Sequence, residues 1–252
     1  EKEDYLMGQS TRKYQLLETN ETYQGEPLYR LQATETFQIK GPGQKSYTID
    51  RGELGGYVTG ENNLSREGTC WIQSPARVVG EAQVSGNAQV TGKALMEGEA
   101  RIRDDAYLWG ANIRDDAVIA GESVIAGEHT RIGGSAYIRS CEIHDHVEVT
   151  GSPYLRESQI LQSCTISGEA QVESSAIGDE IRPRGHAEIG DRARLMFGAV
   201  VEGDSSITGD AVINGAHVVD QKVGGKEVLN GDALHLTGAD LAGLESSESQ
   251  QL

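Results

Sequence analysis

Small and aliphatic residues return every six positions along most of this chain. Between residues 80 and 108, five alanines are spaced by six, and an aliphatic residue or methionine follows each of them two places later. Steps of five to seven residues continue the series from Ile72 to Val219. Of its 26 positions only Pro183 is neither aliphatic nor methionine, and the residue two before is Ala in 14 cases, Ser in four and Cys in three. We call these 26 the core positions.

The period of six predicts the architecture. Residues two apart on a strand point to the same side, so each core position and the small residue before it should face inward. The intervening segments, such as Ser85-Gly86-Asn87, are rich in residues that favour tight corners. Three sides then make a triangular coil of about eighteen residues. With strands about 4.8 Å apart, roughly eight coils would stack into a prism on the order of 40 Å long.

The irregular steps add two expectations. Five-residue sides at 138–143, 155–160 and 172–177 recur seventeen positions apart and should stack on one face. Counting Pro183 as a core position, no side between Ile72 and Val219 exceeds seven residues. The spacing therefore predicts that no long loop interrupts the coils.

The parts outside the repeats suggest caps and tails. Residues 13–71 hold strand-like runs separated by turn-forming segments and should form a small antiparallel β cap. The predicted organisation is a flexible segment at 1–12, this cap, a β-helix over 72–219, a C-terminal cap over 220–244 and a disordered tail at 245–252. Caps are expected because a solenoid otherwise has open strand edges.

Composition agrees with a thin core and narrows the classes of partner. The chain of 252 residues is 37% hydrophobic and 5% aromatic, with 32 glycines and a net charge of −17. Such acidity disfavours direct binding to nucleic acid or to an acidic membrane, because phosphates need Lys and Arg. No apolar run is long enough to span a membrane and no signal peptide is visible, so a cytoplasmic location is expected.

The three cysteines occupy inward positions of the pattern. Cys70, Cys141 and Cys164 each stand two residues before a core position, and their odd number and spacing give no disulfide framework. Free cysteine is often simply buried. We therefore expect small core residues and not nucleophiles.

The repeat resembles the hexapeptide-repeat, left-handed β-helix superfamily, and the left hand of the coil is implied by that resemblance. The segment "KYQLLE…PLYRLQA…GELGGYV…ENNLSREGTCWI", within residues 13–72, is similar to the start of bacterial and phage YdcK-like proteins, which are labelled transferases or polymer-forming proteins. The superfamily's best-known members are acyltransferases that use a histidine near a subunit interface and a long loop around acyl-CoA. The expected absence of such a loop weighs against that activity here.

Histidines give a candidate metal site. His129, His144 and His146 map to one corner of adjacent coils, and zinc prefers such nitrogen ligands. The γ-class carbonic anhydrases of this superfamily hold zinc by histidines between subunits, although their ligand spacing is different. The ordinary alternative is that histidine simply tolerates a turn position.

Two further histidines are given ordinary roles. The spacing places His217 at an inward position near the cap and His186 in a turn beside Arg182 and Arg184.

The outward positions of one side suggest an interface. One residue per coil should line this side, in the order Gln83, Arg101, Val118, Tyr137, Tyr154, Gln171, Glu188 and Ser206. Val118, Tyr137 and Tyr154 form its apolar part. Cross-strand stacking explains such a row locally, whereas an interface explains it because tyrosine is enriched where proteins meet. We favour the interface, most simply in a homo-oligomer.

The sequence thus predicts an all-β, single-stranded left-handed parallel β-helix of bacterial or phage origin that is not an enzyme. It should self-associate as a dimer or trimer and present a rigid surface. Another protein is a further candidate partner for that surface. No cofactor is expected. The alternatives are an acyltransferase using acyl-CoA, a zinc protein like the γ-carbonic anhydrases, and an acidic DNA mimic. The last rests on acids gathered at corners, such as Asp104-Asp105 and Asp115-Asp116, where solvated turns are the ordinary explanation.

Overall fold

The structure is a computed structural model that describes residues 13–231 apart from 145, 162, 178–185 and 197. It divides into two compact units, Glu1–His129 and Thr130–Leu252. The predicted flexible segment at 1–12, most of the predicted C-terminal cap and the predicted tail at 245–252 lie outside the described residues. Every described element is a strand except two short 3₁₀ turns, η1 (Pro42–Gln44) and η2 (Glu61–Asn63). None of these elements is a helix long and apolar enough to cross a membrane.

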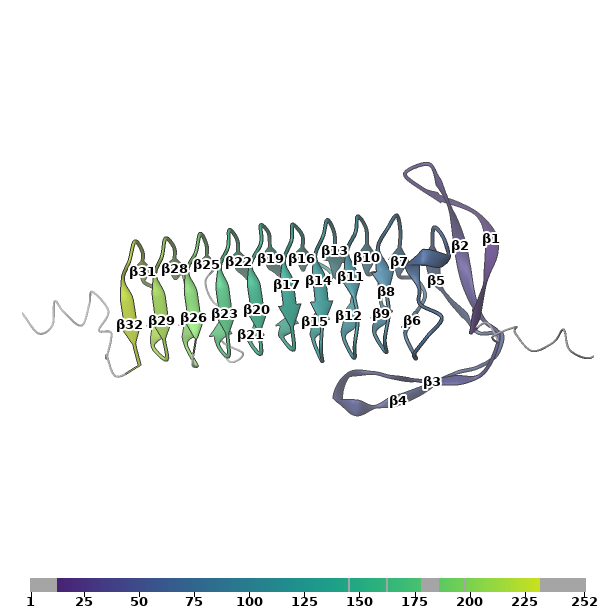
Figure 1. The fold of residues 1–252 in the computed structure, drawn as a ribbon, viewed down its shortest axis with the longest axis horizontal. Helices are drawn as coiled ribbons and strands as arrows, with labels where there is room; N and C mark the ends of the chain where they lie inside the picture. Colours follow the sequence, from purple (N-terminus) through teal and green to yellow (C-terminus); the bar gives the residue numbers. More distant parts are fainter. Residues whose placement is uncertain (1–12, 145, 162, 178–185, 197, 232–252) are drawn as a thin grey trace, which may run out of the picture. The chain divides into compact units, whose positions relative to one another are not determined.

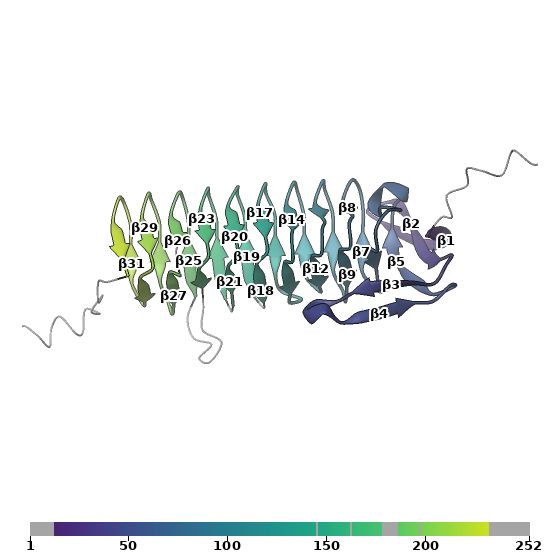
Figure 2. The same cartoon turned by 60° about the horizontal axis from the view of Figure 1, so that its bottom comes forward.

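The first unit begins with the predicted antiparallel cap. Strands β1 (Tyr14–Tyr23) and β2 (Glu26–Ala33) form a hairpin, and β2 also pairs antiparallel with β5 (Leu54–Val58). Strands β3 (Phe37–Lys40) and β4 (Ser46–Ile49) form a second hairpin, which lies alongside the coils in both views (Figures 1 and 2). The sequence predicted a turn in the segment TNETYQGE, residues 19–26, but strand β1 runs to Tyr23 and includes residues 19–23.

The coils of the first unit have three faces of stacked parallel strands. The β6 face holds β6 (Trp71–Ile72), β9 (Gln89–Thr91), β12 (Tyr107–Trp109) and β15 (Val124–Ala126). The β7 face continues from β5 through β7 (Arg77–Val78), β10 (Leu95–Met96) and β13 (Asn112–Ile113). The β8 face holds β8 (Gln83–Val84), β11 (Arg101–Ile102) and β14 (Val118–Ala120).

The second unit repeats this plan. Its β16 face holds β16 (Arg131–Ile132), β19 (Val147–Val149), β22 (Cys164–Ile166), β25 (Ala187–Ile189), β28 (Ser206–Ile207) and β31 (Lys222–Val223). Its β17 face holds β17 (Tyr137–Arg139), β20 (Tyr154–Arg156), β23 (Gln171–Glu173), β26 (Arg194–Met196), β29 (Val212–Asn214) and β32 (Val228–Asn230). Its β18 face holds β18 (Glu142–His144), β21 (Gln159–Ile160), β24 (Ala176–Ile177), β27 (Val200–Glu202) and β30 (His217–Val219).

Both units are therefore parallel β-solenoids, as predicted. Arg77 pairs with Leu95, eighteen positions later, and Leu95 with Asn112, seventeen positions later. The inward positions are buried as the spacing required: Ala100 and Ile102 are fully buried, whereas Arg101 between them is exposed. The left hand of the coil stays a prediction from the resemblance.

At most of the described corners, one left-handed residue stands two places after a core position. Glycine fills most of these places, as at Gly86 and Gly98, both with positive φ. Aspartate fills others: Asp104 has φ 63°, and its Oδ2 accepts a hydrogen bond from the Gly121 N–H of the next coil at 2.9 Å. Asp191 does the same for Gly209 at 2.9 Å. Several corner acids thus have a structural role, because short polar side chains tolerate this conformation.

The expectation that no side exceeds seven residues is wrong. In the second unit Cys164 pairs with Ala187, 23 positions later, whereas Val147 pairs with Cys164, 17 positions later. The chain from Ile177 to Ile189 thus covers one side with twelve residues, and Pro183 lies among the residues not described. The sequence pattern divided these twelve residues into two steps of six, from 177 to 183 and from 183 to 189, and so concealed the insertion.

This insertion also displaces the predicted outward row. Gln171 is followed on the β17 face by Arg194 and then Val212. Glu188 and Ser206, which the spacing assigned to that row, pair with each other on the β16 face.

The predicted inward position of His217 is wrong as well. The step after Ile213 is five residues, so Val218 is the buried core residue, and the His217 side chain is 57% exposed. Its Nε2 lies 3.1 Å from Glu202 Oε2. Left-handed residues at Gly215 and Asp220 agree with this register. The error arose because Val218 and Val219 are both aliphatic.

The three cysteines are buried and form no disulfide with one another, as predicted. Burial raises the pKa of Cys141 to about 11 and that of Cys164 to about 12, above the ordinary 9.0. Because the thiolate is the reactive form, we expect a disulfide reagent at pH 8 to label no thiol in the native protein and all three in urea.

The same shifts predict how stability depends on pH. A thiol whose pKa is raised on folding contributes stability that is complete below pH 9 and is lost as pH rises towards 11–12. The urea midpoint should fall over that range. Native labelling as fast as that of a free thiol, or an unchanged midpoint, would contradict the buried placement.

Candidate functional site

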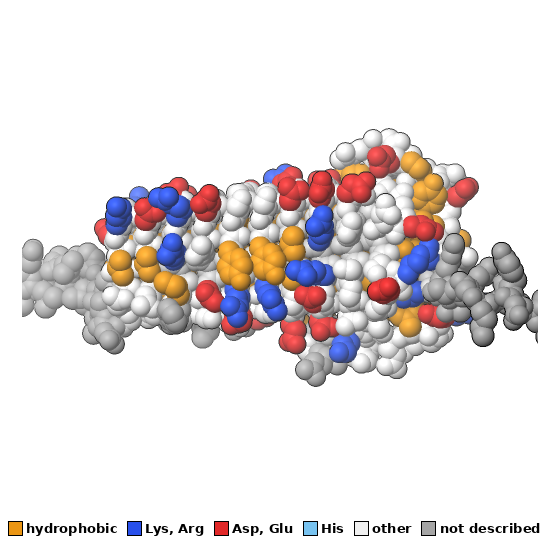
Figure 3. Space-filling view, in the orientation of Figure 1, with side chains coloured by type: hydrophobic (Ala, Val, Ile, Leu, Met, Phe, Trp, Pro, Cys, Tyr) orange, Lys and Arg blue, Asp and Glu red, His pale blue; other side chains and the backbone are white. Residues whose placement is uncertain are grey.

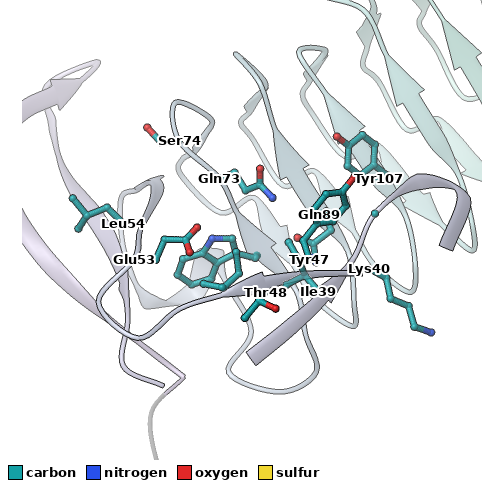
Figure 4. A pocket seen from close by; sticks show the side chains of 13 residues that line it. Ile39, Lys40, Tyr47, Thr48, Glu53, Leu54, Gln73, Ser74, Gln89 and Tyr107 are labelled. Carbon is teal, nitrogen blue, oxygen red and sulfur yellow. The ribbon is translucent and has the colours of Figure 1, made fainter. Parts of the chain in front are cut away.

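A groove in the first unit lies between the β3–β4 hairpin and the β6 face. It has a volume of about 490 Å³, within the usual range for ligand sites. Ile39, Tyr47 and Ile49 line it from the hairpin, and Trp71, Gln89 and Tyr107 line it from the solenoid. Figure 4 shows Leu54 at one end of this groove and Tyr107 at the other.

The solenoid wall of the groove is a ladder of outward residues, one per coil. Trp71 pairs with Gln89, Gln89 with Tyr107, and Tyr107 with Val124. Each stands one place before a core position, so alternation along the strand points it away from the core. The coil repeat therefore stacks an indole, an amide and a phenol.

Gln89 is held in a defined orientation. It is 1% exposed, and its Nε2 donates to the carbonyl oxygens of Thr69 and Asn87, each at 3.0 Å. An amide nitrogen has two hydrogens to donate, so both are used and the oxygen must be the remaining atom. Gln89 Oε1 is buried without a hydrogen-bond partner.

Trp71 has an unpartnered donor, whereas Gln89 has an unpartnered acceptor. Trp71 is fully buried, its ring meets Phe37 edge-on at a centroid distance of 5.5 Å, and its Nε1 donor has no partner. Gly55 gives the indole its room, since a Cβ there would come within 2.8 Å of the Trp71 ring. Among the described side chains three buried polar atoms lack a partner, and two of them, on Trp71 and Gln89, belong to this groove.

The rest of the groove includes two tyrosines and one residue of each charge. Tyr47 is 50% exposed and Tyr107 is half-buried. Burial raises the pKa of Tyr107 above its ordinary 10.0, the nearby Tyr47 adds to this, and a hydrogen bond with Thr91 opposes it. Tyr107 is therefore a neutral phenol at physiological pH. Lys40 and Glu53 are the charged residues of the lining, with opposite signs.

The predicted interface residues are distributed over both units. In the second unit Tyr137 and Tyr154 pair across β17 and β20, and their rings stack 5.5 Å apart at an interplanar angle of 4°. Tyr154 remains 39% exposed. In the first unit Val118 pairs with Arg101 and is half-buried. That Val118 extends the tyrosine row stays a prediction from the spacing.

The histidines proposed as zinc ligands are on the surface. His129 is exposed in a turn of the first unit. In the second unit His144 is half-buried with its Nε2 2.9 Å from Glu142 Oε1, and His146 is exposed. Within the part of the chain that the structure describes, no three or more His, Cys, Asp or Glu side chains are grouped closely enough to hold a metal ion. His186 lies in a described segment and its Nε2 is 2.9 Å from Thr165 Oγ1. Arg182 and Arg184 are among the residues not described.

The groove was missed from the sequence, although part of its signal was there. The outward row Trp71, Gln89, Tyr107 and Val124 recurs at the coil period and was available to the same count that found the tyrosines. The sequence did not show that the β3–β4 hairpin covers this row, because the hairpin's position depends on tertiary packing.

No family model matches the chain, and no curated protein matches it either.

Proposed function

We propose that this protein is a non-enzymatic β-solenoid that self-associates and presents a rigid surface, with the tyrosine patch of the second unit as the self-association site. The patch consists of Tyr137, Tyr154 and the neighbouring Arg139 and Arg156. The observation that carries the proposal is the aromatic stack, which leaves Tyr154 39% exposed on the surface of the β17 face. Figure 3 shows hydrophobic side chains gathered in the middle of one face, beside basic ones.

The surroundings of the patch suit contact with a second copy of the chain. Arg139 pairs with Arg156 along the strands, and Arg156 forms ion pairs with Glu157 at 2.9 Å and with Glu173 at 3.2 Å. The rim of the patch thus offers both charges. Aromatic and arginine side chains enclosed by a polar rim are typical of protein interfaces. A symmetric contact would place the exposed ring faces against their own equivalents.

The test is the native mass of a double variant. We expect Tyr137→Glu with Tyr154→Glu to raise the dissociation constant of the oligomer about 100-fold or more, because it buries two charges at the centre of the contact. Light scattering should then give a mass near the 27.1 kDa of one chain, against at least twice that for the unaltered protein.

A matched control is Tyr29→Glu with Tyr47→Glu, which removes two tyrosines and adds two charges in the first unit. This variant should keep the oligomeric mass. A monomeric unaltered protein, or a double variant of the patch with unchanged mass, would contradict the proposal.

The acyltransferase alternative gains one observation from the structure. The sequence predicted no long side, which weighed against an acyltransferase. The side from Ile177 to Ile189, however, has six residues more than the repeat requires. This alternative predicts binding of an acyl-CoA in a groove between subunits. Calorimetry with acetyl-CoA and succinyl-CoA separates the two, since a purely structural solenoid should give no heat of binding.

The zinc and DNA-mimic alternatives have less support. Elemental analysis of protein purified without a histidine tag tests the first directly. The corner aspartates that suggested DNA mimicry form hydrogen bonds between coils at Asp104 and Asp191, which gives these acids a reason within the fold.

A further inference from the structure

The geometry points to a saccharide-binding site in the first unit: the groove between the β3–β4 hairpin and the β6 face takes a short neutral oligosaccharide. This inference is independent of the proposed self-association, because no residue of the tyrosine patch lines the groove.

The two unpartnered polar atoms define what the ligand must supply. Trp71 Nε1 can only donate a hydrogen bond and Gln89 Oε1 can only accept one. Leaving such buried atoms unpaired is unfavourable, because each has lost its hydrogen bonds to water without gaining another. The two residues are directly paired on adjacent strands, which lie about 4.8 Å apart. Hydroxyl groups suit this pair of atoms, since a hydroxyl can both accept a hydrogen bond from an indole and donate one to an amide oxygen.

The aromatic lining supplies the apolar half of the recognition. A sugar ring has apolar C–H faces and a rim of hydroxyls, so it suits a site where aromatic faces alternate with planar polar groups. Tyr47 from the hairpin and Tyr107 from the solenoid provide the aromatic rings. Gln73, Thr48 and Ser74 add further donors and acceptors to the same lining.

A second cavity extends the groove along the coils. It has a volume of about 510 Å³ and shares Lys40, Gly41 and Tyr107 with the first. Tyr107 therefore stands where the two cavities meet. Two adjoining spaces joined at one aromatic ring fit an elongated ligand of two or more sugar units better than a single sugar.

The charges around the two cavities disfavour an anionic ligand. In the first cavity Lys40 is balanced by Glu53, and the second adds Asp105 and Glu122. With more carboxylates than amines around it, and a chain charge of −17, the groove repels anions. Phosphorylated or uronic-acid sugars should bind more weakly than their neutral counterparts.

The experiment is a fluorescence and calorimetric titration of the full chain carrying Trp109→Phe. Trp109 lines neither cavity, and with it replaced the remaining tryptophan signal comes from Trp71. The probes are cellotriose, maltotriose, mannotriose, galactotriose and triacetylchitotriose at up to about 10 mM, a range that covers weak sites. At least one should change the Trp71 emission with saturation. Trigalacturonate, the acidic counterpart of galactotriose, should bind at least tenfold more weakly.

Variants assign the binding to the groove. Tyr47→Ala removes a half-exposed ring from the hairpin without touching the solenoid core, and it should weaken binding at least tenfold. Gln89→Met should also weaken binding at least tenfold. Because this variant loses the two hydrogen bonds that the Gln89 side chain donates to backbone carbonyls, its thermal unfolding is followed in parallel. Tyr29→Ala, in the cap but outside both cavities, should leave the affinity unchanged.

Three results would overturn the inference. They are the absence of any signal with all five neutral probes, an unchanged affinity in Tyr47→Ala, and binding of trialanine where no saccharide binds. The first would mean that water alone meets the two buried atoms, and the last would identify the groove as a peptide site.

Discussion

Replacing Gly151 with valine should lower the free energy of unfolding by about 3 kcal/mol or more. Gly151 is a corner residue of the second unit with φ 82°, and a Cβ there would lie 2.6 Å from the carbonyl oxygen of Gly168 in the next coil. Valine is β-branched and so resists the left-handed conformation, and its side chain meets backbone that cannot move alone. Urea unfolding followed by circular dichroism measures the loss.

Gly225→Val is the matched control. Gly225 has φ 64°, but nothing lies within 4 Å of a Cβ placed on it. This variant should show only the conformational cost, about 1–2 kcal/mol. Equal losses in the two variants would mean that the corners do not stack closely, and the coil register would then be wrong.

Replacing Ile102 with alanine should lower the free energy of unfolding by about 2–5 kcal/mol. Replacing its neighbour Arg101 with alanine should change it by less than about 0.5 kcal/mol. Ile102 is fully buried at a core position, and Arg101 is exposed on the opposite side of the same strand. The interior of a narrow coil cannot refill the space that isoleucine leaves, because the neighbouring coils fix its width.

This pair of variants tests the alternation directly. A single residue separates a large effect from almost none, and the same chemical denaturation series measures both. Similar losses at the two positions would show that the strand does not present one side to the core.

Much of the fold was predictable because the repeat constrains every residue in the same way. A side chain must be slim two places before each core position and the backbone must turn two places after it, so alanine, aliphatic and glycine positions recur. Even the exceptions keep this rule, as with the left-handed Ser140, Glu157 and Ser174 on the three five-residue sides. These sides stack on the β18 face of the second unit, as their spacing predicted.

The errors in register have a common cause. Core positions were assigned from aliphatic residues at the expected spacing. This assignment fails where a residue that is not in the core also stands at that spacing. Pro183 divided a twelve-residue side into two apparent sides of six. Val219 stood beside the true core residue Val218. The pairing of Cys164 with Ala187 corrects the first error, and the burial of Val218 corrects the second.

The candidate site was less predictable than the fold. The sequence found Tyr137 and Tyr154 because both residues lie on neighbouring coils of one face. It did not find the groove, whose second wall comes from the β3–β4 hairpin. Its strongest evidence, the unpartnered Trp71 Nε1 and Gln89 Oε1, depends on burial by residues distant in the sequence. The groove and the tyrosine patch are on different units, so their functions can be tested separately.

Spin-label proximity tests the stacked coil most directly. In a chain with all three cysteines changed to alanine, we would place nitroxide labels at the exposed positions 83 and 101, and in a second sample at 77 and 83. Gln83 and Arg101 pair on one face although eighteen positions separate them, whereas Arg77 and Gln83 lie six positions apart on different faces. Stacked coils predict strong dipolar broadening between labels at 83 and 101 and much weaker broadening between labels at 77 and 83. Equal broadening, or the reverse order, would contradict the solenoid.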